Sequence, residues 1–231
     1  AITLSPVSAQ PATRVHLLGE GMGASVLLQS NADASGIVIT ASSTTAIGSE
    51  TTVKGLSIVG TGAGVNTQNG IGIQSTAYIS IADCEIIGLA TAIYADNYLS
   101  SILDHVLLEY NTNGFRFEPY VGATGFSESN AITMISCVIG HNTNYGGWIN
   151  GAGTFNVIGG SIENNGAGTD LSTSKWGLKI TDSGGQVADS ASNGFSLHGV
   201  YFEGNGGKAQ LWVEQTVLTA GLASSIVGCS F

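Results

Sequence analysis

A short residue pattern returns seven times along the chain: apolar, any, apolar, two of any kind, a small or thiol residue, any, and apolar. A turn rich in Asn and Gly follows most copies. The aligned positions are Thr51/Val53/Leu56/Ile58, Ile79/Ile81/Cys84/Ile86, Ser100/Ile102/His105/Leu107, Ile132/Met134/Cys137/Ile139, Phe155/Val157/Gly160/Ile162, Phe195/Leu197/Val200/Phe202 and Ser224/Ile226/Cys229/Phe231. Units this short cannot bury their own apolar face, so they must stack on their neighbours. The sequence therefore predicts a solenoid.

Within each unit apolar residues alternate with Ser, Thr or Asn, which is the period of a strand and not of a helix. A second short strand is predicted after each turn, over 71–73, 93–95, 115–117, 147–149, 178–180 and 211–213. The turns carry Asn111, Asn142, Asn165 and Asn205, for which we predict left-handed backbone angles. Two or three short strands per coil, wound in one direction, predict an all-β, single-stranded parallel β-helix.

The composition supports one elongated domain over residues 1–231. The 231 residues are 43% hydrophobic and include 34 Gly, which suits tight bends between stacked strands. With 6 Lys and Arg against 16 Asp and Glu, the net charge of -10 argues against nucleic acid and anionic membrane as partners. No membrane span or secretion signal is visible. Because neither end carries a recognisable cap, we expect a fragment of a longer chain.

The three cysteines, Cys84, Cys137 and Cys229, share one position of the repeat. Cys84 and Cys137 fall two coils apart, or ~9.6 Å, which exceeds the ~7 Å that a disulfide can span. We therefore predict free thiols that fill the core. His105 is aligned to the same position, which predicts a buried histidine. The histidines show no metal-ligand spacing, and no cofactor or metal is predicted.

Residues 14–27, with their strand, Gly-x-Gly turn and second apolar strand, resemble the first coil of pectate-lyase-like right-handed parallel β-helices. Phrases such as "ISIADCEIIG" and "NGFSLHGVYFEGN" are most similar to phage tail spikes and capsule depolymerases. The resemblance implies a homotrimer on the virion tail, outside the cell, that binds a bacterial capsule or O-antigen polysaccharide. The usual N-terminal cap and C-terminal trimerisation region of such proteins are not recognisable here.

The second strands align one outward residue per coil, because their apolar residues point inward. In chain order this row is Gly72, Tyr94, Arg116, Trp148, Lys179 and Trp212. Sugar rings can stack on aromatic side chains, and cations can hold hydroxyls or the carboxylates of acidic sugars. We therefore predict substrate binding by Tyr94, Arg116, Trp148, Lys179 and Trp212.

The next outward row is rich in acids: Gln74, Asp96, Glu118, Asn150, Thr181 with Asp182 beside it, and Glu214. Glycoside hydrolysis uses two carboxylates whose separation decides the stereochemistry. Asp96 and Glu118, one coil apart at ~5 Å, fit a retaining enzyme, and Glu118 with Asp182, at ~9.6 Å, fits an inverting one. Glu118 is the predicted acid because it precedes the long segment 119–131, with Asp96 or Asp182 as its partner and Glu214 as a binding residue.

A competing acidic group comprises Asp83, Asp104, Glu109, Glu163 and Glu203. Asp83 and Asp104 are read as adjacent in the stack, at bends where Asp accepts backbone N–H groups. Glu163 and Glu203 could line a second edge of a groove. Calcium-dependent lyases of this fold use three or more Asp with a basic residue, and Asp96, Glu118 and Arg116 match that set only loosely.

The function predicted from the sequence is a tail-spike receptor-binding protein that binds a bacterial surface polysaccharide and cleaves it as an endo-glycosidase. Two alternatives stay open, a glycan-binding adhesin without catalysis and a purely structural trimeric shaft in which Trp148 and Trp212 meet a neighbouring chain. A polysaccharide lyase is a further alternative.

Overall fold

The computed structural model of the chain describes residues 2–4, 14–30, 34–40, 50–62, 68–122, 125–127, 129–151, 153–166, 175–181, 194–214 and 224–231, with the main chain alone at 75–76, 97–99, 120–122 and 125–127. These residues form strands, turns and bends, and none of them is helical. No membrane-crossing helix occurs among them.

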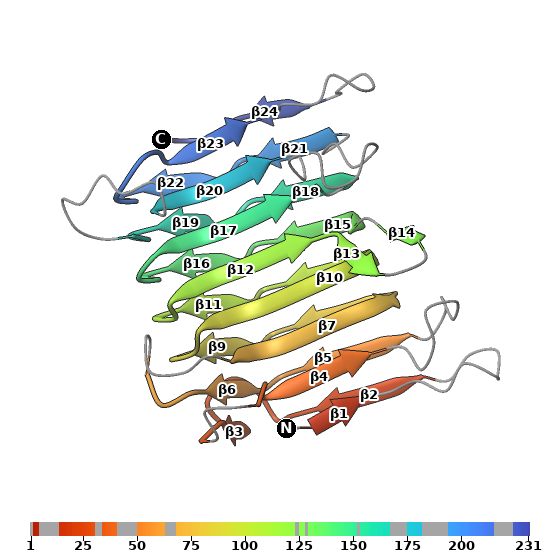
Figure 1. Cartoon of the computed structure of the whole chain (residues 1–231). Coiled ribbons are helices and arrows are strands. Elements are labelled where there is room, and N and C mark those ends of the chain that lie inside the picture. The colour runs from red at the N-terminus through yellow and green to blue at the C-terminus, as the bar shows by residue number, and fades with distance from the viewer. Residues whose placement is uncertain are drawn as a thin grey trace.

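The chain winds through three strand directions per coil, which we call faces A, B and C (Figure 1). Face A comprises β2(Val15–Leu18), β5(Thr51–Lys54), β8(Ile79–Ala82), the end of β10(Thr91–Asp104), β15(Asn130–Ile135), β18(Thr154–Ile158), β21(Gly194–His198) and β24(Ser225–Val227). Face B comprises β3(Val26–Leu28), β6(Ser57–Val59), β9(Glu85–Ile87), β11(Leu107–Glu109), β16(Val138–Gly140), β19(Ser161–Glu163) and β22(Tyr201–Glu203). Face C comprises β1(Ile2–Leu4), β4(Ile37–Thr40), β7(Asn69–Ala77), the start of β10, β12(Asn113–Glu118), β17(Tyr145–Asn150), β20(Trp176–Thr181) and β23(Leu211–Glu214).

Strands of successive coils pair in parallel on all three faces, which confirms the predicted parallel β-helix. Face C lies in front in Figure 1, and the chain climbs from the N-terminus to the C-terminus in a right-handed sense, as parallel crossovers do. The one antiparallel pair among the described strands is the hairpin of β13(Tyr120–Gly122) and β14(Gly125–Ser127), which projects beyond the end of β12.

The register of the third repeat differs by one residue from the predicted one. Leu103 pairs with Ile81 and with Met134, so the inward residues of that coil are Leu103, Val106 and Leu108. Ile102 is 47% exposed, and the side chain of His105 is 60% exposed. The prediction of a buried His105 was therefore wrong. The observed register buries three apolar side chains in place of two apolar residues and an imidazole, which favours it.

A residue in the left-handed region directly follows the face A strand in every coil from β5 onward, and in the coil of β18 the next residue, Gly160, is left-handed as well. The residues that directly follow the strands are Gly55, Asp83, His105, Ser136, Gly159, Gly199 and Gly228. Asp83 therefore has the turn position that was predicted for it. Asp104 does not share it, since Asp104 pairs with Ala82 and its side chain lies 2.7 Å from Nδ1 of the exposed His105.

Asn111, Asn142, Asn165 and Asn205 form a row at the corner between faces B and C, in which the first three are buried and Asn205 is partly buried. Nδ2 of Asn142 donates to Oδ1 of Asn165 at 2.8 Å and to the carbonyl of Leu108 at 2.9 Å. The left-handed residue lies one position earlier, at Tyr110, His141, Asn164 and Gly204, so the prediction of left-handed Asn was wrong. The Asn row instead satisfies buried backbone groups at a bend where no strand ladder is available.

The core runs along the inside of the three faces. Cys84 and Cys137 are buried within it and are free thiols, as predicted, and Cys229 is a partly exposed free thiol. Phe115, Phe117 and Phe155 pack beneath face C, and Gly147 lies against the ring of Phe115, where a Cβ would come within 2.2 Å of Cζ. This close packing allows the strand that carries Trp148 to lie close to the core.

Candidate functional site

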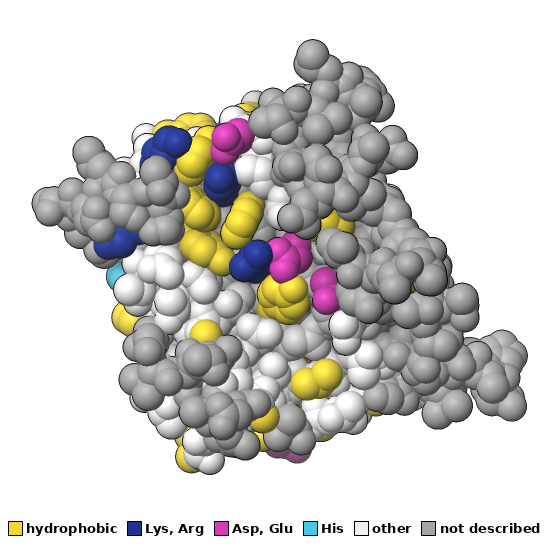
Figure 2. Space-filling model, viewed as in Figure 1, with side chains coloured by type: hydrophobic (Ala, Val, Ile, Leu, Met, Phe, Trp, Pro, Cys, Tyr) yellow, Lys and Arg dark blue, Asp and Glu magenta, His cyan; other side chains and the backbone are white. Residues whose placement is uncertain are grey.

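The register of face C places the predicted row in a single line. Tyr94 pairs with Gly72 and Arg116, Trp148 pairs with Arg116 and Lys179, and Trp212 pairs with Lys179. All five larger side chains point outward and are half-buried. Figure 2 shows the resulting gathering of apolar, basic and acidic side chains on this face. We call Tyr94, Arg116, Trp148, Lys179 and Trp212 the ladder.

The acidic row lies beside the ladder, two residues further along each strand. Asp96 pairs with Glu118 on the next rung, and Thr181 pairs with Glu214. The predicted adjacency of Asp96 and Glu118 is thus present in the register. Asp182, the other predicted partner of Glu118, lies outside the described residues.

Both carboxylate oxygens of Glu118 accept hydrogen bonds from the ladder. The hydroxyl of Tyr94 donates to Oε1 at 2.5 Å, while Nε and Nη2 of Arg116 lie 2.9 and 2.6 Å from Oε2. The Glu118 side chain is only 18% exposed. Burial raises the pKa of Tyr94, and the hydrogen bond to Glu118 raises it further, so the tyrosine keeps its proton as donor. Tyr94 and Arg116 therefore hold Glu118 in a fixed orientation.

Cations and indoles alternate along the upper ladder. The guanidinium of Arg116 lies 4.6 Å from the centroid of the Trp148 ring, and Nζ of Lys179 lies 5.7 Å from it. Arg116 comes from the rung before Trp148 and Lys179 from the rung after, so this indole lies between two cations. Nζ of Lys179 is also 3.8 Å from the Trp212 ring, which Lys208 approaches to 3.4 Å. Each such contact contributes about 0.5–1 kcal/mol at an exposed site and more where water is excluded.

Lys179 has a carboxylate partner as well as its indole neighbours. Its Nζ lies 3.3 Å from Oε2 of Glu214, and its side chain is 14% exposed. Glu214, predicted as a binding residue, therefore neutralises the most enclosed cation of the ladder. Arg116 is similarly paired with Glu118. Both cations are therefore already bound to a carboxylate of the protein when a ligand arrives.

Tyr145 and Trp176, which were not among the residues predicted from the sequence, form a second aromatic row beside the ladder. They pair across neighbouring rungs, and their rings stack with centroids 5.0 Å apart. Nε1 of Trp176 donates to the carbonyl of Gly147, and its ring meets Trp148 and Trp212 edge to face. Burial raises the pKa of Tyr145 to about 12. The sequence does contain a signal for this row, because Tyr145 and Trp176 each lie three residues before a ladder residue.

Three members of the competing acidic group, Glu109, Glu163 and Glu203, lie on face B. Glu109, Gly140, Glu163 and Glu203 follow one another in register, and burial raises the pKa of Glu109. Within the described part of the chain, no three or more His, Cys, Asp or Glu side chains come together in an arrangement that could hold a metal ion.

Comparisons with known proteins give one match. No protein-family model and no curated protein matches the sequence. Among solved structures, the A-module of mannuronan C-5 epimerase AlgE6 from Azotobacter vinelandii is similar, with 13% identity, a TM-score of 0.39, and coverage of 97% of this chain and 89% of the epimerase module.

Proposed function

We propose that face C is the receptor-binding surface of a phage tail spike and binds a bacterial capsule or O-antigen polysaccharide. The observation that carries this proposal is the unbroken register of Tyr94, Arg116, Trp148, Lys179 and Trp212 across five rungs. At ~4.8 Å per rung the row extends over ~19 Å, a length that suits an extended chain rather than a single small molecule.

The side chains of the ladder are ordered before any ligand arrives. Nε1 of Trp148 donates to Oγ1 of Thr181 at 2.9 Å, and the cation contacts fix both sides of the indole. Ordering side chains on binding costs about 0.5–1.5 kcal/mol each, so a preformed row loses less free energy when it binds. A sugar would meet the edge of Trp148, the outer part of Trp212 and the exposed part of Arg116.

The paired cations favour a ligand rich in hydroxyls. A hydroxyl can donate to Glu118 or Glu214 and accept from Arg116 or Lys179, whereas a carboxylate would have to compete with the acid already bound to each cation. The net charge of -10 adds a repulsive background for a polyanion. We therefore expect neutral or sparsely charged glycans to bind more tightly than uronate-rich ones.

Binding is tested with purified capsular and O-antigen polysaccharides and biolayer interferometry. Trp212→Ala should weaken binding at least tenfold, while Tyr201→Ala, which removes an exposed tyrosine from face B, should leave it unchanged. Equal binding by wild type and Trp212→Ala would reject the ladder as the binding surface. If Trp212→Ala instead dissociates an oligomer, as light scattering would report, the shaft alternative holds.

The adjacency of Asp96 and Glu118 supports endo-glycosidic cleavage as a second candidate function. For general-acid catalysis Glu118 must exchange its contact with Tyr94 or Arg116 for one with the glycosidic oxygen. Polysaccharide digestion followed by a reducing-end assay should show activity that Glu118→Gln abolishes without loss of binding. If the wild type binds the polysaccharide without cleaving it, the protein is an adhesin without catalysis. Ultraviolet absorbance from unsaturated uronates would identify a lyase.

The proposal also covers the assembly and the location of the protein. We propose a single β-helix domain within a homotrimeric spike on the virion tail. Light scattering of the purified protein tests the trimer, and labelling of intact phage with an antibody to this chain tests the location.

A further inference from the structure

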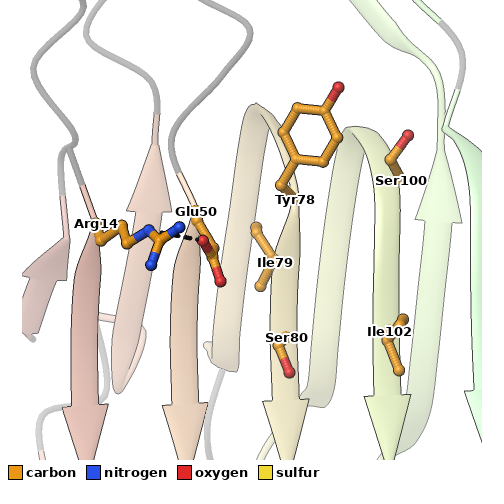
Figure 3. Close-up of a pocket in the computed structure, with 7 residues that line it drawn as sticks. All are labelled: Arg14, Glu50, Tyr78, Ile79, Ser80, Ser100 and Ile102. Carbon is orange, nitrogen blue, oxygen red and sulfur yellow. Dashed lines mark ion pairs between the residues drawn. The ribbon is translucent and has the colours of Figure 1, made fainter. Parts of the chain in front are cut away.

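A cavity of about 420 Å³ opens on face A, near the N-terminal end of the β-helix and away from the ladder (Figure 3). One side of it is a row of residues at the start of face A on four successive coils, Arg14, Glu50, Tyr78 and Ser100. Ser80 and Ile102, which pair across β8 and β10, form the floor. The volume lies in the range of small-molecule pockets, roughly 300–1,000 Å³.

Tyr78 provides an aromatic surface to this cavity. It is 52% exposed, and its backbone has a φ of 57°, a left-handed conformation that is unfavourable for a bulky residue. Ser100 and Ala131, at the same corner of the next two coils, share this conformation. The corner therefore directs the tyrosine ring outward, and within the described part of the chain no aromatic ring or cation packs on it. This distinguishes Tyr78 from Trp148, which lies between two cations.

The rest of the lining is amphipathic and electrically balanced. Ile102 is 47% exposed and offers an apolar surface beside Ser80, while Ser100 lies at the level of Tyr78. Nε of Arg14 lies 3.0 Å from Oε2 of Glu50, so the charged edge of the cavity carries a donor and an acceptor but no net charge. An ionic ligand would find no uncompensated charge here.

We propose that this cavity binds a neutral saccharide unit, a hexose or an N-acetylhexosamine. Its C–H face would pack on Tyr78 and Ile102, and its hydroxyls would bond to the two serines and to the Arg14–Glu50 pair. The site is separate from the ladder, and the proposal does not depend on the ladder binding a glycan.

Saturation-transfer difference NMR tests the proposal with the methyl glycosides of glucose, galactose, mannose, N-acetylglucosamine and N-acetylgalactosamine as probes, and with methyl glucuronide as the charged comparison. At least one neutral glycoside should receive saturation on its ring protons, and methyl glucuronide should not. Tyr78→Asn, which suits the left-handed backbone, should weaken the titrated affinity about tenfold, equivalent to about 1.4 kcal/mol. Tyr78→Phe should retain it, because the ring remains.

Tyr110→Asn, at an exposed tyrosine of similar backbone conformation next to face B, is the matched control and should bind as wild type. The proposal fails if no neutral glycoside receives saturation, if Tyr78→Asn binds as well as wild type, or if the glucuronide binds best. Trp212→Ala separates the two sites, since it should weaken polysaccharide binding at the ladder and leave glycoside binding at Tyr78 intact. Loss of glycoside binding in Trp212→Ala would place the glycosides on the ladder and overturn the Tyr78 site.

Discussion

The guanidinium of Arg116 lies 4.6 Å from the centre of the Trp148 ring, one rung away on face C. The same guanidinium is bonded to Glu118, so charge pairing and ring packing act on one side chain. Arginine suits this position because its planar group can stack on an indole while its N–H edge binds a carboxylate.

We expect Arg116→Ala and Trp148→Ala to show a coupling of about 0.5–1 kcal/mol in a double-mutant cycle measured by urea unfolding, the value of an exposed cation–π contact. Arg116→Lys should recover only part of it, because an ammonium lacks the planar group. Strictly additive effects of the two alanine substitutions would show that the stacked geometry contributes nothing to stability.

Asn142→Ala should lower the free energy of unfolding by about 3 kcal/mol. The substitution leaves the buried carbonyl of Leu108 and the N–H of Asn111 without the partners that Asn142 supplies, at about 1–3 kcal/mol each. Asn144→Ala is the control in the same turn, since its described side-chain bond is a single one of 3.3 Å to Asn113. Chemical denaturation compares the two variants, and equal losses would contradict a special role for the Asn row.

Stability should fall as the pH rises above 10. Burial raises the pKa of Tyr145 from 10.0 to about 12, so between these values the unfolded chain releases a proton that the folded chain retains. The stabilisation is complete below pH 10 and is lost as the pH rises through about 12. Urea midpoints measured across this window should decline less steeply for Tyr145→Phe. An identical decline in that variant would assign the effect to other groups.

Cys84 and Cys137 should resist alkylation in the native protein. Burial raises the pKa of both thiols, that of Cys137 to about 11, and the reactive thiolate is therefore scarce as well as shielded. Mass spectrometry after treatment with iodoacetamide should find Cys229 modified first, and all three cysteines modified in urea. Rapid native labelling of Cys137 would indicate that the coil opens locally.

The strand alternation was sufficient to predict the β-helix and the composition of the ladder, because a period of two fixes which residues point outward. It was insufficient in β10, where the adjacent apolar residues Ile102 and Leu103 permit two registers. Only the packing of Leu103, Val106 and Leu108 against the neighbouring coils selects one of them.

The contacts within the candidate site could not be predicted from the sequence pattern, for a different reason. Rows of outward residues follow from the register, but the pairing of Glu118 with Tyr94 and Arg116 depends on the rotamers that these long side chains adopt. The cavity at Tyr78 likewise depends on a left-handed tyrosine, a conformation that composition does not predict.

The corner between faces A and B has the same length in every coil from β5 onward, with two residues after the face A strand, the first of them left-handed. The chain segments between faces B and C, and between faces C and A, differ in length from coil to coil. New sequence can therefore be grafted at those two corners without altering the phase of the coils around it. The constant corner makes the protein a scaffold whose loops can be exchanged one at a time, and the seven left-handed residues that directly follow the face A strands are the reference points for aligning such chimeras.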